Sequence, residues 1–181
     1  WILENVLNRI PISDCAAGFV KGKSILNHIT PHLGRDKFLY ITDIKNFFPS
    51  ITKKRVIGLF RSLGYNNEVA IILGGICTLK GSLPQGGITS PAISNLVSRS
   101  MDSILRKYAV SNGMSYTRYA DDICISGNSS VDLQISEYVM YSIGLSGFEE
   151  NLKKRRIYYA GDEQKILMGV NISTGIPKLT K

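Results

Sequence analysis

The chain has 181 residues with a formal net charge of +8, and 44% of its residues are hydrophobic. This composition excludes a disordered or collagen-like chain, and no apolar run approaches the roughly 18 residues that a membrane-spanning helix needs. The excess of Lys and Arg, concentrated before residue 62 and after residue 150, favours a polyanionic partner such as a nucleic acid.

The first predicted element is a strand from Lys37 to Asp43, because this run is short, aromatic and β-branched and ends in a polar residue. Two helices are expected after it. Thr52 can cap a helix over residues 53–62, and Asn66 can cap a second helix that reaches about Leu79.

A longer helix and a hairpin come next. Pro suits the first turn of a helix, so Ser90 and Pro91 mark the start of a helix that continues to about Tyr108. Two strand-like runs follow, Ser115–Tyr119 and Ile123–Ser126, with only three residues between them. This spacing predicts a β-hairpin with acidic residues at its tip.

The remaining pattern completes an α+β fold. Ser129 or Ser130 is expected to cap a helix that reaches about Ile143, and residues 156–160 and 166–170 are strand-like. Without the two helices that follow the first strand, the order is strand, helix, strand, strand, helix, strand. This is the ferredoxin-like split βαβ arrangement, an antiparallel sheet with helices on one face.

In that sheet the first strand lies beside the hairpin, so Asp43 meets Asp121 and Asp122 at one end. Three carboxylates held together repel one another unless cations lie among them. Mg²⁺ prefers such oxygen ligands, and two Mg²⁺ ions about 4 Å apart can activate a 3′ hydroxyl and stabilise a leaving pyrophosphate. The three residues therefore predict a nucleotidyl-transfer site. The alternative is that they are ordinary turn acids and a strand-end cap.

Four sequence motifs carry a family resemblance. They are Gly18-Phe19-Val20-Lys21-Gly22-Lys23-Ser24-Ile25, Asp43-Ile44-Lys45-Asn46-Phe47-Phe48-Pro49-Ser50-Ile51, Leu83-Pro84-Gln85-Gly86-Gly87-Ile88-Thr89-Ser90-Pro91, and Tyr119-Ala120-Asp121-Asp122 preceded by Thr117-Arg118. In this order the motifs resemble those of reverse transcriptases, above all the bacterial retron, group II intron and antiviral defence-associated branch.

The resemblance implies an RNA-directed DNA polymerase that extends a DNA or RNA primer along an RNA template with deoxynucleoside triphosphates. Asp43, Asp121 and Asp122 would be the catalytic residues and would bind two Mg²⁺ ions, with Mn²⁺ as an alternative. Phe48 would be a steric gate that excludes a ribose 2′ hydroxyl, and Gln85 would contact the incoming nucleotide. The simpler interpretations are a core position for Phe47 or Phe48, and a Gly-rich turn around Gln85.

Basic residues complete the implied site. Lys21 and Lys23 resemble lysines that hold the triphosphate, although a solvated basic loop is the alternative. Lys154, or its neighbour Lys153, would approach the triphosphate or the leaving group, and a solvated basic face is again the alternative. Residues 167–170 resemble the primer-grip hairpin, or else belong to the core of a sheet.

The resemblance divides the chain into a mainly helical fingers region, residues 1–36 and 52–88, and a polymerase palm, residues 37–51 and 89–181. The palm would end in the primer-grip-like hairpin. No residues are left for the helical thumb of the family, so we expect a fragment or a thumbless chain. The competing interpretation is an RNA-binding or RNA-polymerase-like palm module without reverse transcriptase activity as an isolated fragment.

The cysteines Cys15, Cys77 and Cys124 are odd in number and form no Cys-x-x-Cys pair. This pattern argues against a disulfide framework and against a zinc site, and it favours a reducing, cytoplasmic environment. The chain shows no basic-then-apolar leader, so we expect neither secretion nor a membrane partner. The sequence leaves the oligomeric state open.

Two further pairs have structural explanations. His28 and His32 have a spacing that could bind a metal on a helix face, but Pro31 interrupts the helix, so we expect core or surface histidines. Asp102 and Arg106 have the spacing of an ion pair on an exposed helix face.

Overall fold

The structure is a computed structural model that describes residues 1–128 and 133–179. The predicted helix cap at Ser129 or Ser130 lies outside these residues. Within them, no helix has the length and apolar character that crossing a membrane requires. The three cysteines are buried and no disulfide joins them, as the sequence predicts.

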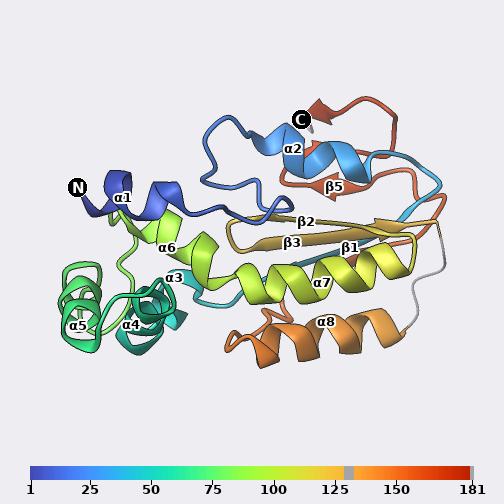
Figure 1. Ribbon diagram of the computed structural model, residues 1–181. Coiled ribbons are helices and arrows are strands. Elements are labelled where there is room, and N and C mark those ends of the chain that lie inside the picture. Colours follow the sequence, from blue (N-terminus) through green and yellow to red (C-terminus); the bar gives the residue numbers. More distant parts are fainter. Residues whose placement is uncertain (129–132, 180–181) are drawn as a thin grey trace. The chain divides into compact units, whose positions relative to one another are not determined.

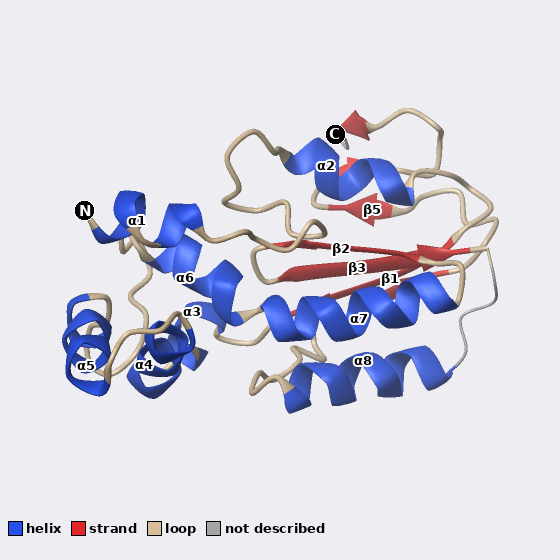
Figure 2. Cartoon of the chain, viewed as in Figure 1, coloured by secondary structure: helices blue, strands red, loops and turns tan. Residues whose placement is uncertain are grey.

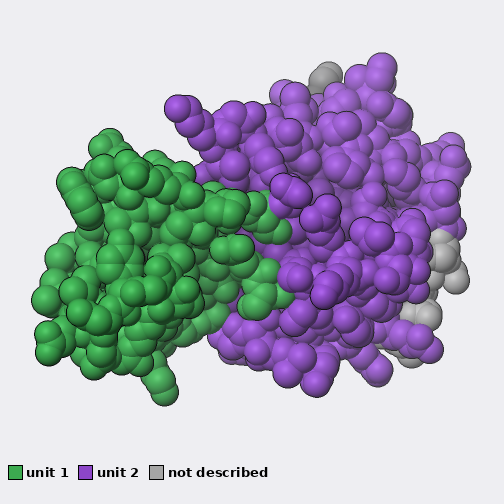
Figure 3. Space-filling model, in the orientation of Figure 1, with its two compact units in different colours: residues 1–13, 46–100 green, residues 14–45, 101–181 purple. Residues whose placement is uncertain are grey.

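The first compact unit comprises residues 1–13 and 46–100 (Figure 3), and its named elements are helices. The helices predicted after Thr52 and Asn66 are confirmed, and each of these side chains accepts a hydrogen bond from a backbone amide of the first turn. The helices of this unit are α1 (Ile2–Asn5), η1 (Leu7–Arg9), α3 (Phe47–Ser50), α4 (Lys53–Ser62), α5 (Asn67–Ile76) and α6 (Ser90–Val97).

The single helix predicted to reach about Tyr108 is two helices in the structure. α6 ends at Val97, and α7 (Arg99–Ser111) follows after Ser98. The hydroxyl of Ser98 donates to the Ser94 carbonyl at 2.8 Å. A serine that bonds back to the preceding turn bends or weakens a helix, which explains an interruption here.

The second compact unit, residues 14–45 and 101–181, is built on an antiparallel sheet with the strand order β2-β3-β1-β4. Helices α7 and α8 lie along one face of this sheet, whereas α2 and a smaller three-stranded sheet lie on the other (Figure 1, Figure 2). The order β1-α7-β2-β3-α8-β4 confirms the predicted ferredoxin-like fold. The remaining elements are α2 (Ile25–Ile29), η2 (Thr30–His32), β1 (Phe38–Asp43), β2 (Ser115–Tyr119), β3 (Asp122–Gly127), α8 (Leu133–Leu145), β4 (Arg156–Tyr158), β5 (Ile166–Leu167), β6 (Val170–Asn171) and β7 (Lys178–Leu179).

These compact units have other bounds than the predicted fingers and palm, and that division of the chain stays a prediction.

In the second unit, a buried apolar cluster joins the main sheet to the elements on its α2 side. Leu39, Ile41 and Cys124 from the sheet pack with Ile29 of α2 and with Ile172, which follows β6. This cluster therefore packs α2 and the smaller sheet against the main sheet.

Residues 166–170, predicted as one strand, form a hairpin of β5 and β6 in the structure. Met168 and Gly169 occupy its turn, with φ values of 49° and 76°. A two-residue turn with two positive φ values matches the twist of a hairpin. Leu167 and Val170 are buried in the cluster described above, which confirms that these two residues belong to the core of a sheet.

The predicted exposed pair of Asp102 and Arg106 is wrong. Asp102 is fully buried, and its carboxylate accepts hydrogen bonds from Tyr116 and Arg118 of β2. Arg106 instead lies 3.4 Å from the Asp14 carboxylate at the surface. Helix α7 therefore turns its acidic residue toward the sheet.

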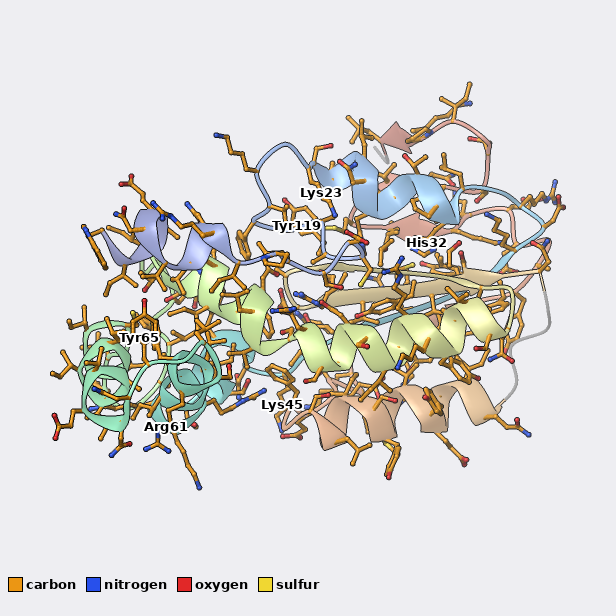
Figure 4. All side chains as sticks on the ribbon, in the orientation of Figure 1. Lys23, His32, Lys45, Arg61, Tyr65 and Tyr119 are labelled. Carbon is orange, nitrogen blue, oxygen red and sulfur yellow. The ribbon has the colours of Figure 1, made fainter. Side chains whose placement is uncertain are left out.

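A buried polar network links the two histidines to the sheet. His32, labelled in Figure 4, has Nδ1 at 2.7 Å from Ser126 Oγ and Nε2 at 2.7 Å from Thr117 Oγ1. The Thr117 hydroxyl also lies 2.7 Å from His28 Nδ1. Burial is the main cause that lowers the pKa of His28 to about 4 and that of His32 to about 3. Of the two expected locations, core or surface, the structure places both histidines in the core.

We predict that the protein loses stability as the pH falls from 6.5 toward 4. The unfolded chain takes up protons on both histidines near pH 6.5, whereas the folded chain keeps them neutral until about pH 4 or below. At pH 4 the free energy of unfolding should be lower by roughly 3 kcal/mol from His28 alone, and urea unfolding measures this loss. The variant His32→Asn should show a shallower pH dependence, and an unchanged dependence would contradict this role of the network.

Candidate active site

The backbone brings the three predicted aspartates together. β1 ends at Asp43 and β3 begins at Asp122, and these two residues are partners in the antiparallel register. Asp121 lies in the turn before β3, where its carbonyl accepts a hydrogen bond from Ile44 N at 3.1 Å. Both strand ends lie at the same end of the main sheet (Figure 1).

The turn between β2 and β3 is closely packed against the segment that precedes α2. Ala120 has a φ of 56°, which non-glycine residues rarely adopt. At Gly18 a Cβ atom would come within 2.5 Å of Ala120 N, so only glycine fits there. Arg118 N donates to Cys15 O at 2.9 Å, and Ala17 N donates to Arg118 O at 2.8 Å. The glycine of the first motif therefore supports the turn of the fourth.

Asp43 is 4% exposed and has two side-chain donors from the segment before β4. Lys154 Nζ donates to its Oδ2 at 2.8 Å, and Asn151 Nδ2 donates to its Oδ1 at 3.0 Å. The Lys154 side chain is itself 62% exposed. The sequence left Lys153 and Lys154 as alternatives; both are exposed, and it is Lys154 that contacts an aspartate.

Glu150 holds this segment in place, and sequence reasoning did not identify it. Its carboxylate accepts hydrogen bonds from Tyr40 and Thr42, both at 2.7 Å, and from two nitrogens of Arg155. These hydrogen bonds lower the pKa of Glu150 despite its burial, which acts in the opposite direction. The hydroxyls of Tyr40 and Thr42 at alternate positions of β1 are the sequence signal that could have indicated a buried acceptor.

The aspartates repel one another. Burial raises the pKa of Asp122 to about 6, and the charges of Asp121 and Asp43 add to this effect. The pKa of Asp121 is raised by burial and by its contact with Asp43. The hydrogen bond to Asp43 raises the pKa of Lys154, so this ammonium stays charged beside the carboxylates. One ammonium among three carboxyl groups leaves an excess of negative charge.

This donor set fits a hard divalent cation, because it consists of carboxylate oxygens with uncompensated charge. Among residues 1–128 and 133–179, no group of three or more His, Cys, Asp or Glu side chains already has the arrangement of a metal site. Lys154 and Asn151 engage both oxygens of Asp43 instead. Metal binding by the three aspartates therefore stays a prediction.

The two residues expected to recognise the nucleotide belong to the first compact unit, whereas the aspartates belong to the second. Phe48 lies on α3 and is half-buried, with its ring centroid 5.5 Å from that of the buried Phe47. Phe47 is thus the core ring of this pair. Gln85 is exposed in a turn where Gly87 N donates to Pro84 O at 3.3 Å.

The two lysines of the first motif have different surroundings. Lys21 is exposed. Lys23, labelled in Figure 4, donates from Nζ to the carbonyl oxygens of Asp14 at 2.5 Å and Ala16 at 2.8 Å. In this conformation Lys23 braces the segment beside β2, and triphosphate binding by either lysine stays a prediction.

A ferredoxin-like sheet with three carboxyl groups and a lysine at one end is typical of the palm of nucleic-acid polymerases. The chain belongs to the reverse transcriptase family, since the family model for Reverse transcriptase (RNA-dependent DNA polymerase) matches residues 2–172. The family predicted from four sequence motifs is therefore confirmed.

Curated relatives are retron enzymes of bacteria. The chain is 40% identical to the Retron Ec86 reverse transcriptase of Escherichia coli, over 92% of this chain and 52% of that protein. It is 36% identical to the Retron Mx65 reverse transcriptase of Myxococcus xanthus, over 96% of this chain and 44% of that protein. The chain thus spans about half the length of these relatives.

Solved structures of telomerase share the fold. A telomerase of Candida tropicalis, in a complex with a fragment of telomeric RNA, matches with a TM-score of 0.62 and 13% identity, over 78% of this chain and 29% of that one. The apo telomerase of the same organism matches with a TM-score of 0.61 and 12% identity, over 80% of this chain and 33% of that one. At this identity the match supports the fold alone.

We predict that Asp122→Asn stabilises the protein when no divalent cation is present. At pH 7.5 the wild-type carboxylate is charged although the fold raises its pKa to about 6, so its removal relieves repulsion. With solvent screening taken into account, the free energy of unfolding should rise by about 1–2 kcal/mol, measured by urea unfolding in the presence of EDTA. Added Mg²⁺ should stabilise the wild type more than the variant. The exposed change Glu137→Gln serves as the control, and equal stability of Asp122→Asn and wild type would contradict the repulsion.

Proposed function

We propose that the chain is the catalytic part of an RNA-directed DNA polymerase, which adds deoxynucleotides to the 3′ end of a DNA or RNA primer on an RNA template in the cytoplasm. The observation that carries this proposal is the cluster of Asp43, Asp121 and Asp122 beside Lys154, in a chain of the reverse transcriptase family. The similarity to retron enzymes favours a retron over a group II intron or a defence system.

In this proposal Asp43 and Asp121 bind Mg²⁺, and Asp122 lies beside them at the metals or the primer end. Two bound Mg²⁺ ions would supply activation of the primer 3′ hydroxyl and stabilisation of the leaving pyrophosphate. Asn151 orients Asp43 through its amide. Lys154 has an exposed, charged ammonium that can move from Asp43 to the leaving phosphates and neutralise them.

Only the family pattern assigns selection of the substrate to residues of the first three motifs. Phe48 would place its ring beneath the sugar and exclude a 2′ hydroxyl. Gln85 would contact the incoming nucleotide from its exposed turn. Lys21, which is exposed, would meet the triphosphate, and Lys23 would do so only by leaving its two carbonyl partners.

Asp121→Asn should lower primer extension on an RNA template by at least about 100-fold, because it removes one charged ligand of the proposed metals. Asp36→Asn, an exposed aspartate away from the cluster, is the matched control and should be active. Intact extension by Asp121→Asn would refute the assignment. Wild-type RNA binding without any Mg²⁺-dependent incorporation would instead support an RNA-binding module.

Phe48→Ala should admit ribonucleotides, with the ratio of deoxynucleotide to ribonucleotide incorporation falling by about 10-fold or more, since the ring is the proposed barrier to the 2′ hydroxyl. Single-nucleotide incorporation assays measure this ratio. Phe47→Leu is the control, because Phe47 is buried and should affect stability without changing sugar choice. An unchanged ratio in Phe48→Ala would remove Phe48 from the site.

A further inference from the structure

A fully buried ion pair lies beneath the turn that carries Asp121. Arg118 of β2 and Asp102 of α7 both have side chains that are 0% exposed. Arg118 Nε donates to Asp102 Oδ1 at 2.7 Å, and Nη2 donates to Oδ2 at 2.8 Å. The Tyr116 hydroxyl donates to Oδ1 at 2.8 Å. The planar guanidinium is therefore clamped in one orientation by a bidentate contact.

The third arm of this guanidinium reaches the turn itself. Arg118 Nη1 donates to the carbonyl oxygen of Ala120 at 2.8 Å. A peptide group is planar, so the orientation of the Ala120 carbonyl also fixes the amide nitrogen of Asp121. The left-handed φ of Ala120 is unfavourable for an alanine by roughly 1–2 kcal/mol and needs support from its surroundings. Gly18 supplies packing against this backbone, and Arg118 supplies a charged hydrogen bond.

Stability alone does not explain such a pair. Taking two charges out of water is costly, and apolar side chains of similar volume often replace a buried ion pair without loss of stability. The guanidinium also donates a hydrogen bond to the backbone of the turn. This bond fixes the direction of one carbonyl group, which apolar residues cannot do.

We propose that Arg118, held by Asp102, is a positioning residue that fixes the Ala120 carbonyl and thereby sets where the Asp121 carboxylate lies. Arg118 acts through the turn and does not touch the substrate. The inference rests on the proposed function, because it needs Asp121 to be a metal ligand.

The decisive variant removes the buried polar groups together. Arg118→Met, Asp102→Leu and Tyr116→Phe in one chain leave no unpaired buried charge and replace each polar side chain by an apolar one of similar shape, but they remove the hydrogen bond to Ala120. We expect an unfolding midpoint close to that of the wild type. We also expect Mn²⁺ affinity, measured with the metal alone by electron paramagnetic resonance, to fall by at least about 10-fold. In primer extension kcat should fall by about 100-fold, while KM for the nucleotide changes little.

A purely structural role predicts the opposite, since a stable triple variant would then bind Mn²⁺ and extend primers like the wild type. That result overturns the inference. If the triple variant does not fold, Arg118→Lys decides, because it keeps the charge beside Asp102 but cannot bond to both Asp102 oxygens and to Ala120. A lower Mn²⁺ affinity and kcat in Arg118→Lys support the inference, and wild-type values overturn it.

The control is Lys165→Met. Lys165 is also buried, and its ammonium donates to the carbonyls of Arg35 and Lys37, away from the turn. This variant should lose stability and keep Mn²⁺ affinity and kcat. The Mn²⁺ measurement separates this inference from the proposed function. A wild-type protein that binds Mn²⁺ but extends no primer would contradict the polymerase activity. The effect of Arg118 on Mn²⁺ affinity could still be measured in that case.

Discussion

The register between β1 and β3 is the constraint on which the site depends. Because Asp43 pairs with Asp122 and Asp121 occupies the adjoining turn, folding places three carboxyl groups at one end of the sheet. A shift of one residue would move a side chain to the opposite face of the sheet. Burial and the neighbouring negative charges both raise the pKa values of Asp121 and Asp122, and a divalent cation would relieve the repulsion.

Polar groups around this end of the sheet are fixed by contacts that are themselves buried. Glu150 anchors the segment whose side chains bond to Asp43, and Arg118 holds the turn that carries Asp121. Each of these two groups is satisfied by several hydrogen bonds. A site whose residues are locked by such supporting bonds loses little free energy to reorganisation when it binds its ligand.

Much of this arrangement follows from the sequence, because the order of the strands and the short hairpin bring the acidic residues to one end of the sheet. The supporting contacts do not. Asp102 has a suitable partner at Arg106 in the sequence, and only the packing of α7 against β2 directs it to Arg118. Whether Lys23 faces solvent or the carbonyl oxygens of its own loop likewise depends on the loop conformation.

In the proposed function, Asp43 and Asp121 bind divalent cations after Lys154 has left Asp43. The most direct measurement is a crystal soaked in Mn²⁺, in which anomalous scattering locates the metal. We expect a peak within about 2.5 Å of oxygens from Asp43 and Asp121, with Lys154 displaced from Asp43. The absence of a peak at this end of the sheet in a metal-saturated crystal, with Lys154 still bonded to Asp43, would contradict it.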